Sequence, residues 1–408
     1  MTEQQNTPEL RFPGFERKWE ILKLNEVLEN KTNGIKRGPF GGALKKEIFI
    51  NDGYAVYEQK NAIYDNQYFR YYIDKDKYEE MKLFAVKPED IIMSCSGTIG
   101  KLSKIPKNYK KGIINQALIR FRTNSHVISQ FFLIYMRSNI MQRKILEANP
   151  GSAIRNLIPV KELKNLRFPL PTLEEQQKIG DFFSKLDRQI ELEEQKLELL
   201  EQQNMAYIHQ IFSKILKFKD DKGNKYPEWV PKKLGDIGKV VMNKRIYKNE
   251  TTENGEIPFY KIGNFGKSAD TFITREKFNE YKEKYPYPNV GDILISASGS
   301  IGRTIEYTGE DAYYQDSNIV WLDHNDEVLN KYLKYFYKIV KWAGVEGTTI
   351  KRLYNKNILN TMIDLPNIEE QKKISSFLTK LEELVEKQSS KVELLKECKR
   401  GLLQKMFV

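Results

Sequence analysis

Two glycine-rich phrases hold the residue types closest to phosphate chemistry. Residues 96–101 read SGTIGK and residues 298–303 read SGSIGR, each directly after an apolar run. A P-loop needs GxxxxGK[ST], but here the glycines stand three positions apart and Leu102 follows the lysine, so the P-loop pattern fails. Two interpretations stay open: a tight structural turn, or a turn whose amides and Lys101 or Arg303 contact a nucleic-acid phosphate.

Other polar and basic side chains are candidates for reading base edges, because Asn, Gln, Arg, Lys and hydroxyl side chains match the donor and acceptor pattern of the grooves. In the first half the DNA-binding candidates are Lys36, Arg37, Lys60, Asn61, Arg70, Ser96, Lys101, Asn115, Gln116 and Arg155. In the second half they are Lys244, Arg245, Lys261, Asn264, Ser298, Arg303, Gln315, Ser317, Asn318, Lys351 and Arg352. Each alone is more often a solvated surface residue. The aromatic side chains between Tyr54 and Tyr72 could stack on bases, although most of them are expected in the core.

Nothing in the sequence indicates catalysis. His126, His209 and His324 are scattered, and no Cys/His spacing fits zinc. The nucleophile elbow and the dinucleotide fingerprint are both missing from the sequence. We therefore expect no catalytic residue, no metal site and no cofactor bound by this chain.

A long repeated segment must position these loops. Residues 170–212 and 365–407 align without a gap at an offset of 195, with 16 of 43 positions identical. Each copy opens with Leu-Pro followed by two glutamates, which favour a helix N-terminus. Apolar residues then alternate at spacings of four and three, which is the heptad pattern of a coiled coil. The predicted seam comprises Ile179, Phe183, Leu186, Ile190, Glu193, Leu197, Leu200 and Asn204 in the first copy, and Ile374, Leu378, Leu381, Val385, Gln388, Val392, Leu395 and Lys399 in the second.

The polar interruptions of the seam predict how the two helices pair. They fall in the same two layers of both copies. An antiparallel pairing would place Glu193 against Lys399 and Asn204 against Gln388, with apolar residues opposite each other elsewhere. A slip of one heptad would bury each polar group against an aliphatic one, at roughly 1–3 kcal/mol each.

The repeat continues outside the helices. Residues 87–101 correspond to residues 289–303, each predicting a turn, a buried strand (Ile91–Met93 or Ile293–Ile295) and the glycine-rich loop. Residues 151–157 (GSAIRNL) correspond to 347–353 (GTTIKRL), which indicate a helix N-cap carrying a basic residue. The fold class expected is α+β, with two similar mixed domains separated by two long antiparallel helices. The predicted parts are a lead at 1–18, domains at 19–170 and 228–365, helices at 171–216 and 366–408, and a linker at 217–227.

Composition and charge indicate the class of partner and where on the chain it would bind. The 408 residues carry a net charge of +12, and only Cys95 and Cys398 are present, which fits a reducing cytoplasm. No apolar run is long enough to span a bilayer. Residues 1–170 carry +11, whereas the first helix segment, 171–216, carries −4. A polyanionic partner is therefore expected at the domains rather than at the coil.

This arrangement resembles the specificity subunit of a type I restriction–modification enzyme. The resemblance covers essentially the whole chain and is strongest at 170–186 and 365–381, which share L-P-x-[LI]-E-E-Q-x-K-I. It implies that each domain reads one half of a bipartite, asymmetric double-stranded DNA site and that the helices set the spacer. It also implies two methyltransferase (modification) subunits that bind S-adenosylmethionine, and restriction subunits that use ATP and Mg. The alternative considered is a coiled-coil scaffold or RNA-binding adaptor.

The lead before Trp19 resembles the linker before Trp229. By pseudo-two-fold symmetry, we expect the lead to pack near the end of the second helix.

Overall fold

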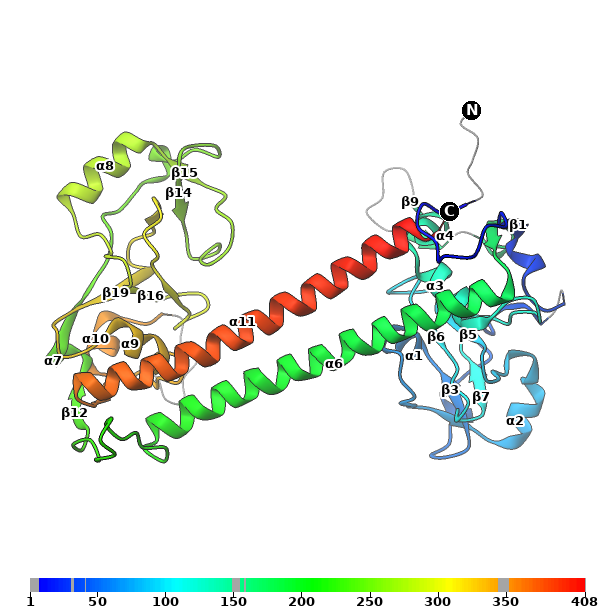
Figure 1. Cartoon of the computed structure of the whole chain (residues 1–408), viewed down its shortest axis with the longest axis horizontal. Coiled ribbons are helices and arrows are strands. Elements are labelled where there is room, and N and C mark those ends of the chain that lie inside the picture. The colour runs from blue at the N-terminus through cyan, green and yellow to red at the C-terminus, as the bar shows by residue number, and fades with distance from the viewer. Residues whose placement is uncertain are drawn as a thin grey trace. The chain divides into compact units, whose positions relative to one another are not determined.

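A computed structural model describes residues 7–30, 33–40, 42–148, 155–157, 159–343 and 352–407. The chain forms two compact units, one of residues 1–194 with 390–408 and the other of residues 195–389. Helices α6 (Leu173–Phe212) and α11 (Ile368–Lys405), green and red in Figure 1, each contribute one part to each unit. Both helices begin two residues after their predicted starts.

The described residues of the first unit form four small sheets, one of which is a two-stranded pair near residues 146–157. In a four-stranded antiparallel sheet, β2 (Ile35–Arg37), β8 (Leu118–Phe121), β5 (Ile91–Ser94) and β6 (Leu102–Lys104) follow one another. A three-stranded sheet has the order β4 (Tyr72–Ile73), β3 (Tyr54–Tyr57) and β7 (Gly112–Ile114), with β3 and β7 parallel. Strand β1 (Glu20–Lys23) pairs with β11 (Arg167–Leu170). The helices are α1 (Gln59–Tyr64), α2 (Lys75–Glu80), α3 (Ser129–Arg137), α4 (Asn139–Ile145) and α5 (Val160–Leu163).

The second unit repeats this topology. Its four-stranded sheet has the order β13 (Gly238–Val241), β19 (Ile319–His324), β16 (Ile293–Ser296) and β17 (Thr304–Glu306). Its three-stranded sheet consists of β15 (Phe272–Ile273), β14 (Ile257–Tyr260) and β18 (Tyr313–Tyr314), and β12 (Val230–Lys233) pairs with β20 (Met362–Leu365). Helices α7 (Leu234–Ile237), α8 (Arg275–Lys284), α9 (Asn330–Phe336) and α10 (Asn355–Asn360) complete it. The repeated strand order confirms two similar α+β domains.

The predicted strands lie at the centre of each unit. All four residues of β5 and of β16 are buried, as the unbroken apolar runs required. In the first unit an aromatic cluster packs beside the sheet, where Trp19 and Phe131 contact Phe407 with ring centroids about 6 Å apart. The C-terminal end of α11 therefore completes the core of the first unit.

Within each unit, the parts of α6 and α11 lie antiparallel. Phe183 stacks on Phe407 in the first unit, and Tyr207 meets Phe377 edge-on in the second. The predicted seam residues are buried or half-buried, whereas Leu199 and Leu394 on the outer faces are exposed.

The ion pairs between the long helices involve partners other than the two predicted for the seam. Glu193 forms an ion pair with Lys391, and Lys399 forms one with Asp187. In both pairs the lysine of α11 reaches an acidic residue of α6, and all four side chains keep part of their surface in contact with water. Asn204 and Gln388 are both buried, as their seam positions required.

The described part of the N-terminal lead, residues 7–18, packs at the end of α11, which confirms that prediction. The amide of Leu10 donates to the Lys405 carbonyl at 2.9 Å. In the second unit the amide of Leu216 donates to the Gln210 carbonyl at 3.0 Å, at the equivalent point of α6. The lead therefore occupies the place that the linker takes after the first helix.

The helix N-cap predicted for residues 151–157 and 347–353 is wrong where it can be followed. Residues 155–157 form β10 (Arg155–Leu157), which pairs with β9 (Leu146–Ala148). Arg352 forms an isolated β-bridge with Ser298. Residues 151–154 and 347–351 lie outside the described part of the chain. At both basic residues the backbone is extended and pairs with another segment, although the local sequence pattern predicted the start of a helix.

Candidate nucleic-acid interface

Each glycine-rich loop is held in its shape by hydrogen bonds to the serine that ends the preceding strand. Ser94, the last residue of β5, donates its hydroxyl to the Thr98 carbonyl and accepts from the Lys101 amide, and the Gly100 amide donates to the Ser94 carbonyl. Gly97 and Gly100 have φ values of 62° and 80°, a region that glycine occupies without strain. The second copy repeats these bonds around Ser296. The turn thus uses two of its own amides, which favours the structural interpretation and leaves the exposed Lys101 and Arg303 side chains as its possible phosphate contacts.

In the first unit, three loops converge beside the glycine-rich turn. The Cys95 amide donates to the Ala117 carbonyl at 2.9 Å, which joins the turn to the loop after β7. The Ser96 hydroxyl lies 3.2 Å from Gln59 at the start of α1. Burial raises the pKa of the Cys95 thiol, and Arg37 next to it opposes that shift. Predicted residues Arg37, Ser96 and Gln116 therefore share one edge, and the exposed Lys60 follows Gln59 in the chain.

Other candidates of the first unit lie apart from this edge or have structural roles. The Lys36 ammonium lies 5.1 Å from the centre of the Phe84 ring, on the opposite face of β2 from Arg37. Arg70 stacks over Tyr71 at 4.4 Å. The Asn115 side chain accepts from the Ala117 amide and so shapes its own loop.

The structure does not support Asn61 as a base-reading residue. It is buried, its amide donates to the carbonyls of Asn66 and Tyr68, and its side-chain oxygen caps the Glu58 amide. These bonds fix the ends of α1 and leave no polar atom for a base. A buried asparagine and an exposed one have the same letter in a sequence.

The second unit brings together more of the predicted residues, around the loop that follows β18. The Ser298 hydroxyl donates to the Asn318 side chain at 2.8 Å, and Arg352 donates to the Ser317 carbonyl at 2.7 Å. Arg245 forms a 2.8 Å ion pair with Asp316 in the same loop. The side chain of Gln315 accepts from the Ile262 amide. Arg245, Ser298, Gln315, Ser317, Asn318 and Arg352 thus form one cluster, the 315–318 cluster.

The remaining candidates of the second unit do not join this cluster. Lys244 lies over the Tyr285 ring at 5.0 Å, and Lys261 lies 3.5 Å from Asp270. The structure does not support Asn264 as a base-reading residue either, because it is buried and donates to Asp270. Lys351 lies outside the described residues, and Arg155 is placed only as part of β10.

Part of the positive charge of the first unit is internal. Arg122 pairs with Asp90 through two 2.7 Å bonds, and both side chains are nearly buried. Burial lowers the pKa of Arg120 to about 10, so this side chain stays charged at neutral pH and donates to backbone carbonyls. These arginines stabilise the sheet and are unavailable to a partner.

Sequence reasoning missed two exposed aromatic residues. Phe40 is 93% exposed in a GPFGG segment beside Arg37, and Tyr354 is 63% exposed two residues after Arg352. An aromatic residue between glycines, or next to a basic residue in a loop, was the available signal. Such side chains supply stacking surfaces for bases. Tyr64 and Tyr68, which were predicted as part of the aromatic segment, are also exposed.

The repeated E-E-Q phrase has a structural role that the sequence did not reveal. The Gln176 side chain accepts from the Ile128 amide and donates to the carbonyls of His126 and Pro171. Gln371 makes the same three bonds in the second unit, with Leu329, Glu327 and Pro366. The glutamine thus fastens the start of each long helix to the loop that precedes α3 or α9.

The described part of the chain was also compared with the side-chain clusters that bind metal ions in proteins. Across these residues, no group of three His, Cys, Asp or Glu side chains could hold an ion. Nor does the same part contain a helix that is long and apolar enough to cross a membrane.

The comparisons with known proteins all lead to the same family. Residues 16–202 and 226–394 match the family model described as the type I restriction modification DNA specificity domain. A putative type I restriction enzyme specificity subunit of Haemophilus influenzae is 60% identical over 153 residues, which are 37% of this chain and 40% of that protein. The putative MjaX specificity subunit of Methanocaldococcus jannaschii is 23% identical over 94% of this chain and 92% of its own length.

Two solved structures share the fold. The S subunit of a type I restriction–modification system from M. genitalium matches with a TM-score of 0.55 at 18% identity, covering 98% of this chain and 99% of that one. A chain from a structure described as addressing assembly and conformational transition of the type I system matches with a TM-score of 0.59 at 16% identity, with the same coverage.

Proposed function

Because this chain belongs to the type I restriction–modification DNA specificity family, we propose that each unit reads one half of a bipartite double-stranded DNA site. The observation that carries this proposal is the duplicated edge. In both units, the loop after the parallel strand β7 or β18 meets the glycine-rich turn, and the residues around this junction include basic, amide and hydroxyl side chains. Specificity subunits recognise DNA and are not catalytic, so chemistry belongs to the other subunits.

The two edges differ in the side chains that they present, which is what an asymmetric site requires. The first edge offers Arg37, Ser96 and Gln116, and the second offers the 315–318 cluster. The matched backbone keeps both edges in the same role, while the different side chains select different bases.

The long helices carry the remaining parts of the proposal. Their length sets the number of unread base pairs between the half-sites. Two modification subunits that bind S-adenosylmethionine dock on the helices, and restriction subunits that use ATP and Mg join them in the cytoplasm. No cofactor is bound by this chain.

The test is methyladenine mapping across the genome of a host without other modification systems. The full chain is co-expressed with its modification subunit, and a methylated bipartite motif with a fixed gap is the expected result. Exchanging residues 19–170 for those of a relative should then change one half of the motif and leave the other half and the gap intact. An assembled complex that methylates no split motif would overturn the proposal.

The structure also predicts the effect of one arginine. Arg352→Met removes a side chain of the 315–318 cluster, and a base contact of this kind contributes about 1–3 kcal/mol of discrimination, or about 5–150-fold. We expect weaker binding of the target duplex in fluorescence anisotropy and relaxed sequence preference at one half-site only. Arg275→Met is the matched control, because Arg275 lies on α8, outside the cluster, and pairs with Asp311. Equal losses in the two variants would contradict a role in base reading.

A further inference from the structure

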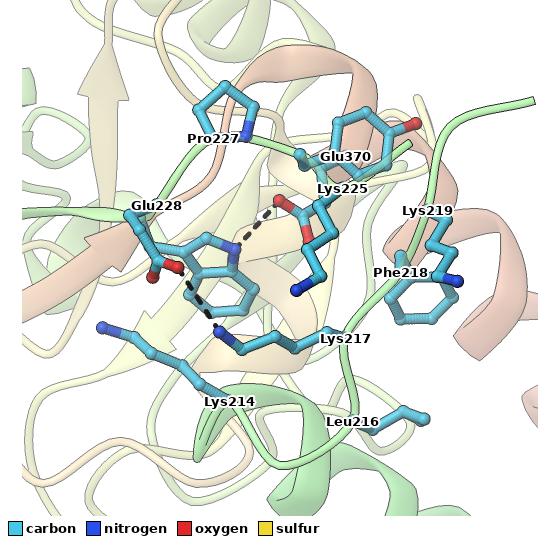
Figure 2. Close-up of a pocket in the computed structure, with 11 residues that line it drawn as sticks. Lys214, Leu216, Lys217, Phe218, Lys219, Lys225, Pro227, Glu228 and Glu370 are labelled. Atoms are coloured by element: carbon cyan, nitrogen blue, oxygen red, sulfur yellow. Dashed lines mark hydrogen bonds and ion pairs between the residues drawn. The ribbon is translucent and has the colours of Figure 1, made fainter. Parts of the chain in front are cut away.

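A small pocket in the second unit lies where the linker passes the start of α11. It has a volume of about 90 Å³, and Figure 2 shows the residues around it. The aromatic and apolar wall includes Phe218, Pro227 and Trp229, and the Glu370 carboxylate lies beside the indole. The Trp229 indole N–H donates to that carboxylate at 2.9 Å.

The first unit contains the same arrangement, and there it is filled. Trp19 donates to Glu175 at 3.1 Å, and Arg11 binds both carboxylate oxygens of Glu175 at 2.7 and 2.8 Å. The same guanidinium donates to the carbonyl of Arg17, two residues before the tryptophan, at 2.6 Å. Glu175 is 0% exposed.

The two halves can be aligned through these residues. Leu10-Arg11-Phe12 corresponds to Leu216-Lys217-Phe218. Phe12 packs edge-on against Phe182, and Phe218 packs edge-on against Phe377, the residue equivalent to Phe182. Lys217 therefore stands in the position of Arg11.

Lys217 does not replace the guanidinium. Its ammonium lies 3.4 Å from Glu228 (Figure 2). These two side chains are 60% and 85% exposed. Among the described residues, no ion pair reaches Glu370, although this residue is only 3% exposed. Burial raises the pKa of the Glu370 carboxyl, while the Trp229 hydrogen bond and Lys217 oppose that shift.

We propose that this pocket binds a guanidinium group, that of an arginine side chain presented by another polypeptide. The planar fork of a guanidinium matches a carboxylate through two parallel bonds and stacks on aromatic faces, which a lysine ammonium cannot do. Pro227, two residues before Trp229, lines the pocket at the position equivalent to Arg17. The inference does not depend on DNA reading.

Four lysines line the pocket, Lys214, Lys217, Lys219 and Lys225, and the first two have acidic partners. Lys214 pairs with Asp364 at 3.0 Å, and Lys217 pairs with Glu228, so two of the neighbouring charges are compensated. The Lys214 ammonium also lies 5.9 Å from the centre of the Trp229 ring, which shows that the indole already accepts a cation beside it.

The experiment titrates the full chain, carrying ¹⁵N-labelled tryptophan, with N-acetylarginine amide and, in parallel, with N-acetyllysine amide. The readout is the indole N–H resonance of Trp229, assigned by its loss in Trp229→Phe. We expect a saturable shift with the arginine compound, at least tenfold weaker binding of the lysine compound, and no shift of the Trp19 resonance, because Arg11 already fills that site.

Two variants make the test decisive. Lys217→Arg should place a guanidinium in the pocket from within the chain and weaken binding of the arginine compound at least tenfold. Glu370→Gln should weaken binding by a similar factor. Failure of the Trp229 resonance to shift, equal shifts with both compounds, or unchanged binding in Glu370→Gln would overturn the proposal. Agmatine carries a guanidinium without a peptide, and tenfold tighter binding of agmatine than of the arginine compound would overturn the polypeptide source.

Discussion

Replacing Arg11 by methionine should destabilise the first unit by about 3–5 kcal/mol, because it leaves the fully buried Glu175 carboxylate without its cation. The pKa of Arg11 itself is raised, mainly by its hydrogen bond to Glu175, which shows the same coupling from the other side. Urea unfolding followed by hydrogen-exchange mass spectrometry of α3 peptides would measure the loss in the first unit alone.

The internal repeat supplies the control. Lys217→Met removes the equivalent cation of the second unit, but the Lys217–Glu228 pair is exposed and should contribute less than about 1 kcal/mol. The double variant Arg11→Met with Glu175→Gln should recover much of the lost stability, because no unpaired buried charge remains. A loss in Arg11→Met no larger than that in Lys217→Met would contradict the assigned role of this pair.

The second large effect is expected at Gly38, which follows β2 at the edge of the first unit. A Cβ at this position would lie 1.8 Å from the Asn115 carbonyl oxygen, so backbone must move in Gly38→Ala. The displaced segment contains Asn115, whose side chain shapes the loop, and Gln116 of the proposed reading edge. We expect target affinity to fall at least tenfold, about 1.4 kcal/mol, while binding to unrelated DNA changes little.

The neighbouring glycine provides the comparison. A Cβ at Gly42 meets nothing within 4 Å, so Gly42→Ala should bind the target as the parent chain does. Fluorescence anisotropy with the assembled complex, on target and scrambled duplexes, measures both quantities. Parallel losses on the two duplexes would show that Gly38→Ala unfolds the unit instead of disturbing its reading edge.

The parts of this molecule that sequence reasoning predicted well are periodic or duplicated. The heptad pattern located α6 and α11, and the aligned phrases located β5, β16 and the N-terminal lead. Each of these patterns either involves residues close together in sequence or occurs twice in the chain. The burial of Asn61 depends on how α1 packs against β5 and β6, and the pairing of Arg352 with Ser298 joins residues far apart in sequence, so neither carried such a signal.

Side-chain reach also limited the prediction of the helix register. The Glu193–Lys399 pair was inferred from seam layers alone. A lysine side chain is long enough to contact residues outside its own layer of the seam. Lys399 pairs with Asp187, and Lys391 pairs with Glu193. The position of a helix face could be predicted, but the choice among several solvated partners could not.

The division of the chain between its units has a consequence for synthesis on the ribosome. The second unit is continuous in sequence, so all of its residues are made before those of α11 that belong to the first unit. The first unit must wait for Met406 and Phe407, which fill its aromatic core against Trp19 and Phe131. The half that is translated first is therefore the half that matures last, with an apolar face exposed to chaperones during most of translation.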